Sequence, residues 1–349
     1  MKGTNTANIC RLKRPLMLVA TLVGSILTGT TTADEPVNTE QLVAEMNQRI
    51  ATIMRSSPIN GVIPRFNQAK SLGCLDATFR VHESINNEFR QGLFAQPGSY
   101  RARLRFANAS RQDDSEKDIR GLSIKIFGVK GETLWGESGI QDFLLNSYPA
   151  LFVGTPEDFL DFIRARQEDK MVGFFINPFD SHLKSLWILF KARAVHSSPF
   201  SIRYWSTTPY RLGTDDSMAV KYSVTPCSGT SEPPAGQPGK DQLRSAMKAH
   251  LDQAPVCLEF GIQKRTHPGD MPIEDASVIW AEDVSPFHTV ATLTIQQQAF
   301  DSPEALAACE KIRFNPWQSL SEHQPLGRMN EVRRETYFSA SQLRTKGAP

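Results

Sequence analysis

The chain has 349 residues, with 39 lysines and arginines against 37 aspartates and glutamates, and 40% of its residues are hydrophobic. A net charge of +2, with 22% charged and 9% aromatic residues, excludes a disordered chain, a collagen and a coiled coil, and lacks the basic excess of a nucleic-acid binder. The length fits one large domain or two modest ones.

The N-terminus has the composition of a secretory signal peptide. Four basic residues and no acidic ones precede an apolar run at 15–29, small residues follow, and the first acidic residue is Asp34. A transmembrane anchor is the alternative, but this run is shorter than the ~20 residues that cross a hydrocarbon core, and no other stretch is long enough. We therefore expect residues 1–33 to be cleaved, leaving a secreted or periplasmic domain, 34–349, with a formal charge of −2.

The mature chain would keep four of the five cysteines, in a compartment where disulfides persist. None stands in a C-x-x-C pair or beside histidines at zinc-binding spacing, so zinc is not expected. One or two disulfides and buried unpaired thiols both remain open, and the spacing does not determine a pairing. The four are Cys74, Cys227, Cys257 and Cys309.

The periodicity of apolar residues predicts a helix first and then a mixture of strands and helices. Residues 37–55 carry Leu42, Met46, Ile50 and Ile53 at helical spacing. Alternating apolar and polar residues predict half-buried strands at 77–81, 100–106, 121–129, 218–226, 257–265 and 290–296. Further helices are predicted at 156–169, 180–196, 240–251, 302–312 and 329–345.

These elements do not alternate regularly as strand and helix, which favours an antiparallel α+β arrangement over a doubly wound sheet. The Pro/Gly-rich stretch 229–240 is too short to separate two domains, so we expect a single domain from about residue 36 to 345.

The predicted C-terminal helix brings three residues onto one face. Arg333, Tyr337 and Arg344 lie at offsets of 0, 4 and 11, which places them within about 40° of one another. Two arginines beside a tyrosine favour the phenolate, which is a hard ligand for ferric iron. On spacing alone, an amphipathic helix with solvated arginines and a core tyrosine explains the same pattern.

This R-x-x-x-Y pattern, followed by Arg seven residues after the Tyr, resembles the proximal haem segment of the haem catalases. Residues 64–81, 92–110, 118–128 and 141–163 resemble, in order, the distal loop, the first barrel strands and the stretch with the distal Asn of that family. Weaker similarities at 204–213, 278–295 and 314–327 extend the resemblance over roughly 60–345. The resemblance implies an antiparallel β-barrel of the catalase type with surrounding helices, without the family's appended C-terminal domains.

The resemblance also implies a site for haem b. Tyr337 would be the axial iron ligand, Arg333 its charge partner, and Arg344 a contact to the porphyrin side. Arg65 and Arg105 would face the haem propionates, and Phe152 would pack near the porphyrin. Without the resemblance, Arg105 is one of three alternating arginines on an ordinary solvated strand face, and Phe152 is a core residue.

The sequence departs from the family where the catalases carry their distal His, three residues after the arginine that matches Arg65. Gln68 stands there, and Gln68 and Asn146 are predicted to be the catalytic residues of the distal side. An amide cannot shuttle a proton as imidazole does, and the loss of a general acid–base lowers a rate by ~10²–10⁴. Ala107 also stands where the family usually has Ser. No sequence reason brings a histidine into the pocket, whether His82, His182, His196, His250, His267, His288 or His323.

Three functions are compatible with these residues. The first is a haem enzyme that acts on peroxides, organic hydroperoxides more readily than hydrogen peroxide. The second is a non-catalytic haem-binding or haem-sensing periplasmic protein, and the third is a barrel that has lost haem and binds another apolar ligand. We expect a small-molecule peroxide as the partner, no nucleic acid, no stable membrane span after signal cleavage, and an open choice between monomer and homo-oligomer.

Overall fold

The computed structural model describes residues 38–59, 61–178, 181–215, 218–229 and 236–346. The predicted signal peptide, 1–33, lies outside these residues and stays a prediction. Residues from Asn38 onward belong to one compact unit. Across the described ranges, no helix is long and apolar enough to span a membrane.

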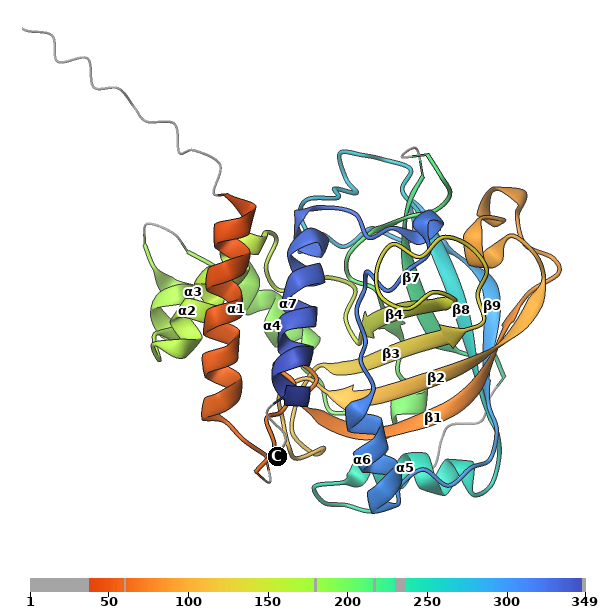
Figure 1. Cartoon of the computed structure of the whole chain (residues 1–349), viewed down its shortest axis with the longest axis horizontal. Coiled ribbons are helices and arrows are strands. Elements are labelled where there is room, and N and C mark those ends of the chain that lie inside the picture. Colours follow the sequence, from red (N-terminus) through yellow and green to blue (C-terminus); the bar gives the residue numbers. More distant parts are fainter. Residues whose placement is uncertain (1–37, 60, 179–180, 216–217, 230–235, 347–349) are drawn as a thin grey trace, which may run out of the picture. The chain divides into compact units, whose positions relative to one another are not determined.

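The described chain consists of a nine-stranded antiparallel sheet with helices around it (Figure 1). The strands are β1 (Lys70–Val81), β2 (Gly98–Asn108), β3 (Arg120–Phe127), β4 (Ile140–Asn146), β5 (Tyr204–Trp205), β6 (Tyr210–Arg211), β7 (Ala219–Pro226), β8 (Val256–Lys264) and β9 (Phe287–Ile295). The helices are α1 (Thr39–Ser56), α2 (Pro156–Gln167), α3 (Met171–Ile176), α4 (Leu183–Ala192), α5 (Gln242–Leu251), α6 (Pro303–Lys311) and α7 (Arg328–Lys346). Short 3₁₀ turns lie at Asn87–Phe89, Gly92–Phe94, Pro199–Ser201 and Ser321–His323.

Eight of the strands close into a barrel. The order is β5-β4-β3-β2-β1-β9-β8-β7, and β5 pairs in turn with β7, so the sheet has no open edge along this ring; β6 adds to β7. Buried side chains such as Phe79, Phe106, Phe143 and Phe260 fill the interior, which is therefore a packed core. The predicted α+β class with an antiparallel barrel is confirmed.

Strand alternation divides the side chains of β2, β3 and β4 between the core and an outer face. Phe106, Leu122 and Leu145 are register partners that point into the barrel core. One position along, Arg105, Ser123 and Leu144 are partners, and because side chains alternate they point to the outer face. The next outward row is Ala107, Gly121 and Asn146.

Helices α1, α2, α3, α4 and α7 gather beside this part of the barrel, whereas α5 and α6 lie near β1 (Figure 1). The helix α1 packs on α2 and α7 through a second apolar cluster that includes Met46, Ile50, Leu160 and Val332. The predicted spacing of apolar residues in α1 is borne out, since Leu42 and Met46 are buried.

Two predicted elements have other bounds in the structure: the strand predicted at 77–81 begins at Lys70, and the helix predicted at 180–196 is confined to Leu183–Ala192. The helix α3 was not predicted. The strand β4 was also missed, because six of its seven residues are buried and no alternation is visible.

Candidate functional site

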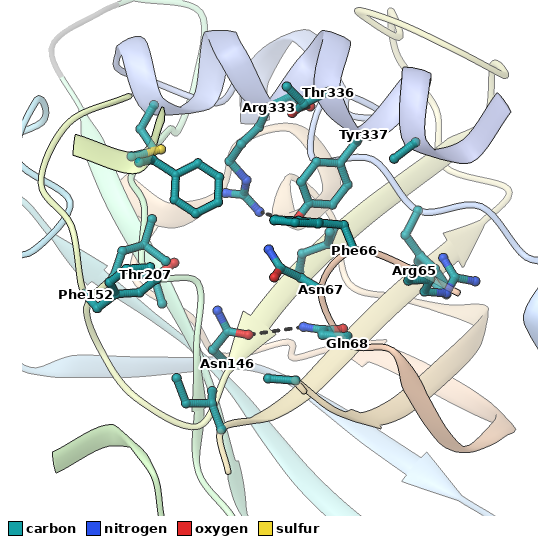
Figure 2. Close-up of a pocket in the computed structure, with 18 of the residues that line it drawn as sticks. Arg65, Phe66, Asn67, Gln68, Asn146, Phe152, Thr207, Arg333, Thr336 and Tyr337 are labelled. Atoms are coloured by element: carbon teal, nitrogen blue, oxygen red, sulfur yellow. Dashed lines mark hydrogen bonds between the residues drawn. The ribbon is translucent and has the colours of Figure 1, made fainter. Parts of the chain in front are cut away.

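A pocket of about 230 Å³ lies between the outer face of β2–β4 and helix α7. Figure 2 shows Arg333, Thr336 and Tyr337 reaching from α7 on one side and Gln68 and Asn146 on the opposite side. All eight residues predicted for the site line this one pocket: Arg65, Gln68, Arg105, Asn146, Phe152, Arg333, Tyr337 and Arg344. They come from segments far apart in the sequence.

Gln68 and Asn146 face each other across the pocket floor. The Gln68 Nε2 group donates to Asn146 Oδ1 at 3.1 Å, and the hydroxyl of Ser123 donates to Gln68 Oε1 at 3.4 Å. An amide pair of this kind can accept and donate hydrogen bonds but does not titrate near neutral pH. This side of the pocket can therefore orient a polar ligand without supplying a proton shuttle.

The backbone of Gln68 is held in an uncommon conformation. Its φ of 56° lies in the left-handed region, and Arg105 Nη2 donates to its carbonyl oxygen at 3.1 Å. Its side chain lies flat on β3 at Gly121, where an added Cβ would approach the carboxamide to 2.2 Å. Glycine at 121 is thus required for the observed position of Gln68.

At the side of the pocket, Arg65, Arg105 and Arg344 form a cluster, called the arginine cluster below, around Glu310 of α6. Arg105 Nη2 lies 3.1 Å from Glu310 Oε1, and Arg65 Nε lies 3.5 Å from Oε2. Arg65 Nη2 and Arg344 Nη1 also donate to the Glu310 carbonyl oxygen, at 3.2 and 2.8 Å. Three cations therefore converge on one carboxylate and one helix end.

The cluster has more positive than negative charge. Burial lowers the pKa of Arg65 well below its usual value, and the charges of Arg105 and Arg344 act in the same direction. Burial alone would raise the pKa of Glu310, but Arg105 and Arg65 outweigh it and hold the pKa below its usual value. Arg105 is 1% exposed, and its Nε makes no hydrogen bond with a described residue.

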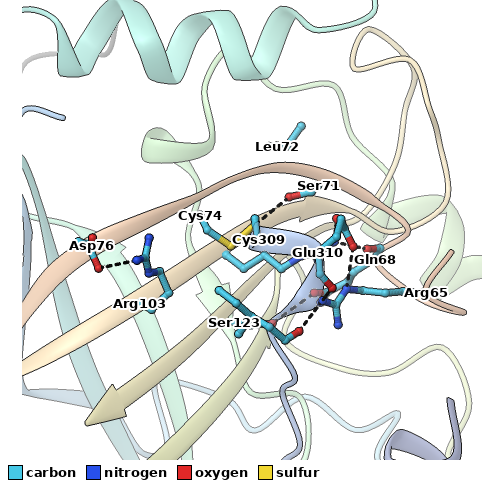
Figure 3. The surroundings of a disulfide bond; sticks show 12 residues. Arg65, Gln68, Ser71, Leu72, Cys74, Asp76, Arg103, Ser123, Cys309 and Glu310 are labelled. Carbon is cyan, nitrogen blue, oxygen red and sulfur yellow. Dashed lines mark hydrogen bonds and ion pairs between the residues drawn. A yellow bond between two sulfur atoms is a disulfide. The ribbon is translucent and has the colours of Figure 1, made fainter. Parts of the chain in front are cut away.

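A disulfide anchors the end of α6 that carries Glu310. Cys309 is bonded to Cys74 of β1, with Ser71 Oγ 3.3 Å from Cys309 Sγ (Figure 3). The second disulfide, Cys227–Cys257, joins the end of β7 to the start of β8. All four cysteines of the predicted mature chain are therefore paired, a choice that the sequence left open.

On α7, Arg333 bonds to the phenol of Tyr337. Arg333 Nη2 donates to Tyr337 Oη at 3.3 Å, while Nη1 donates to Thr208 Oγ1 at 2.8 Å and to Asn330 Oδ1 at 2.9 Å. Thr208 belongs to the loop between β5 and β6, so this loop fixes the guanidinium under the tyrosine. The predicted face of the helix is confirmed, with Arg333 on Tyr337 and Arg344 in the arginine cluster.

Aromatic and aliphatic side chains form the rest of the wall. The Phe152 ring meets Phe162 at 4.6 Å in an edge-to-face contact, and Phe66 meets Phe159 at 6.5 Å. Met46 and Ile50 of α1 line the pocket as well. A mostly apolar wall with a few charged groups is typical of a pocket for a small organic ligand.

Sequence reasoning missed three residues of this site. Phe66 and Asn67 line the pocket and stand inside the motif that begins at Arg65, so the motif itself was a signal for them. Glu310 had no such signal, because its role depends on the fold of α6 against the arginines. The arginines needed a counter-charge, but nothing in the local sequence identified it.

Among the described residues, no histidine lines the pocket, and no group of three His, Cys, Asp or Glu could hold a metal ion. His323 is a core residue whose Nε2 accepts from Leu93 N at 2.9 Å and whose Nδ1 lies 3.0 Å from Tyr222 Oη. Burial lowers its pKa to about 3, so it is neutral at physiological pH. The seven histidines of the chain all lie in described segments, and none of them lines this pocket.

No protein-family model matches the sequence, and no curated protein matches it. The fold is similar to solved catalases. A fungal catalase has a TM-score of 0.64 and 17% identity, covering 84% of this chain and 61% of its own, and catalase A from Saccharomyces cerevisiae has 0.60 and 16%, covering 84% and 63%. A bacterial catalase has 0.63 and 15%, covering 95% of this chain and 67% of its own.

The chain therefore has a catalase-like fold, as the resemblance implied. It spans less than two thirds of the length of the two fungal enzymes.

Proposed function

We propose that the pocket binds haem b, with the Tyr337 phenol oxygen as the ligand of ferric iron and the arginine cluster facing the two propionates. One observation carries this proposal: a tyrosine hydroxyl bonded to an arginine and a buried excess of arginine charge line the same apolar pocket. The catalase-like fold supports it. With Arg333 beneath the tyrosine, a phenolate at Tyr337 would have its counter-charge in place.

The residues fit the group in charge and in hydrogen-bonding capacity. Three arginines against Glu310 leave two positive charges, which two propionates would neutralise. A guanidinium has five N–H groups, and Arg65 uses only Nη2 for hydrogen bonds to described residues. The orphaned Nε of Arg105 is a further donor.

When bound, the ferric haem would supply the iron centre at which the O–O bond of a peroxide is split. The chain would contribute Gln68 and Asn146, which can hold a peroxide oxygen by hydrogen bonds, and Arg333, which holds the charge at Tyr337. The described pocket lining contains no His, Asp, Glu, Lys or Cys, so it lacks the side chains that most often carry a proton between two oxygens near pH 7.

We therefore propose organic hydroperoxides as substrates in preference to hydrogen peroxide. Disproportionation of hydrogen peroxide requires a proton to move from one oxygen to the other, whereas rearrangement of an alkyl hydroperoxide after O–O cleavage depends less on such a shuttle. The apolar side chains of Met46, Ile50 and Phe66 would contact the alkyl part. We also propose that the protein acts in a secreted or periplasmic setting, where the two disulfides would persist.

A hemin titration followed by absorption spectroscopy tests the ligand. The pocket has a second tyrosine, Tyr148, which provides a matched control. Wild type and Tyr148→Phe should develop the same Soret spectrum, and Tyr337→Phe should lose it. An unchanged spectrum in Tyr337→Phe would overturn the assignment of the ligand.

The same titration with hemin dimethyl ester, which lacks the two carboxylates, tests the arginine cluster. It should bind at least tenfold more weakly than hemin, because a charge-assisted hydrogen bond contributes ~1.5–3 kcal/mol. Equal affinities would contradict the placement of the propionates.

A non-catalytic haem-binding or haem-sensing role is the second candidate, and the replacement of the distal histidine by Gln68 favours it. Oxygen evolution from hydrogen peroxide and consumption of cumene hydroperoxide by the hemin-loaded protein separate the two roles. Consumption of the organic hydroperoxide above the rate of free hemin supports the enzyme. No turnover of either peroxide, with hemin bound, supports binding alone.

A further inference from the structure

The outer face of α4 carries an apolar stripe, defined here as Leu183, Leu186, Trp187 and Phe190. Their exposed fractions are 55%, 42%, 59% and 68%. At 100° per residue the four positions fall within an arc of about 100°, so they form one continuous strip along the helix. The rings of Trp187 and Phe190 stack, with centroids 5.9 Å apart.

The opposite face of the same helix packs inside the protein. Ser185, Ile188 and Ala192 are buried, and Ile188 and Ala192 line the pocket. An amphipathic surface helix normally turns polar side chains outward. The helix α4 is apolar on both faces, and within the described chain nothing covers the stripe to the extent needed to bury it.

Basic residues border the stripe. Lys184 and Lys191 lie next to each other in the helical projection, at one edge of the stripe, and α4 contains no acidic residue. Lys191 Nζ lies 4.8 Å above the Trp187 ring, and Lys184 Nζ lies 3.5 Å from Asp275 Oδ2, which balances part of its charge. Arg193 follows the last residue of the helix.

Large aliphatic and aromatic side chains flanked by lysines are the composition of a helix that lies in a membrane interface. The stripe offers on the order of 450 Å² of apolar surface, which is close to the apolar share of a standard protein interface, so its charge and not its area distinguishes the occupants. A symmetric contact between two copies would bring the lysines of both copies together, whereas anionic lipid headgroups would pair with them.

We infer that the apolar stripe of α4 binds the surface of an anionic lipid bilayer, with the helix in the plane of the interface. At ten residues α4 is about 15 Å long, too short to span the hydrocarbon core. The inference does not depend on the proposed function, because it concerns the face of α4 directed away from the pocket.

Vesicle co-sedimentation of the purified protein tests the inference. Vesicles contain phosphatidylcholine, alone or with 30% phosphatidylglycerol. Wild type should bind the anionic vesicles at least tenfold more tightly than the neutral ones, because each basic residue near the surface contributes about fivefold. Trp187→Ser with Phe190→Ser should weaken binding to anionic vesicles at least tenfold, and Lys184→Glu with Lys191→Glu should remove the preference for them.

Matched controls are Ile279→Ser with Val284→Ser, two exposed apolar residues elsewhere, and Lys130→Glu, an exposed lysine elsewhere. These variants should bind like wild type. Since all variants share one N-terminus, differences between them report on the substituted residues. Failure of wild type to bind vesicles, or equal loss in the controls, would overturn the inference. So would a dimer, detected by sedimentation velocity, that the Trp187/Phe190 variant abolishes.

Discussion

Removal of the Cys74–Cys309 disulfide should lower stability more than removal of Cys227–Cys257, and it alone should weaken hemin binding. The cysteines are 235 residues apart in the first pair and 30 apart in the second. In the chain-entropy model the two cross-links contribute ~5.5 and ~3.6 kcal/mol, so the free energies of unfolding should differ by about 2 kcal/mol.

The effect on hemin follows from the position of Cys309 beside Glu310. The disulfide fixes the last turn of α6, whose Glu310 side chain and carbonyl oxygen hold the arginine cluster. Without the disulfide, Glu310 is no longer held in place, and the arginines lose a fixed hydrogen-bond partner. The loss of one charge-assisted hydrogen bond corresponds to a decrease in hemin affinity of about tenfold or more. The second disulfide joins β7 to β8, and neither of its cysteines is among the described residues that line the pocket.

The assay compares Cys74→Ala/Cys309→Ala with Cys227→Ala/Cys257→Ala by urea denaturation and by hemin titration. Both variants should unfold at lower urea concentration, the first more than the second. Only the first should bind hemin more weakly. Equal hemin affinity in both variants, or a weaker affinity in the second alone, would refute the role given to α6.

Three further changes test other parts of the account. Gln68→His should raise oxygen evolution by the hemin-loaded protein by ~10²–10⁴. The φ of 56° at this position is one that histidine tolerates. If the variant binds hemin normally and shows no gain, the missing base does not explain the low activity. Gly121→Ala should displace Gln68, break its 3.1 Å bond to Asn146 and lower the free energy of unfolding by about 1 kcal/mol. In a Gln68→Ala background the same change should have little effect, and an undiminished loss there would speak against the contact. Burial lowers the pKa of His323 to about 3, against ~6.5 when unfolded, so its contribution to stability is complete above pH 6.5 and falls by about 3 kcal/mol on acidification to pH 4.5. His323→Gln should flatten the pH dependence of urea denaturation over this range, and an identical slope in both proteins would exclude His323 as its source.

Most long strands of the barrel could be predicted from the alternation of apolar and polar residues. One face of such a strand packs into the core, while the other face is less buried. The strand β4 shows where this fails. Its outward residue Asp142 is buried, since Asn315 N donates to Asp142 Oδ2 at 3.1 Å and Asp142 N donates to the Gln318 carbonyl oxygen at 2.7 Å. Residues about 170 positions away in the sequence cover the outer face of β4, and the sequence of β4 itself does not predict this contact.

The arginines of β2 show that burial in the site also depends on residues distant in the sequence. Arg101, Arg103 and Arg105 alternate along one face, and the pattern alone gives all three the same surroundings. In the structure Arg101 is exposed, Arg103 pairs with Asp76 and is 32% exposed, and Arg105 is buried.

The decrease in exposure from Arg101 to Arg105 is caused by the position of α6. The Cys74–Cys309 disulfide holds this helix over one end of β1 and β2, where Glu310 reaches Arg105. The sequence predicted α6 as a helix but left the pairing of its cysteine open, so it could not distinguish a solvated arginine from one fixed in a pocket. Only the resemblance to the catalases distinguished Arg105 from the other two arginines. A family motif reflects the tertiary packing around a residue, whereas alternation along a strand does not.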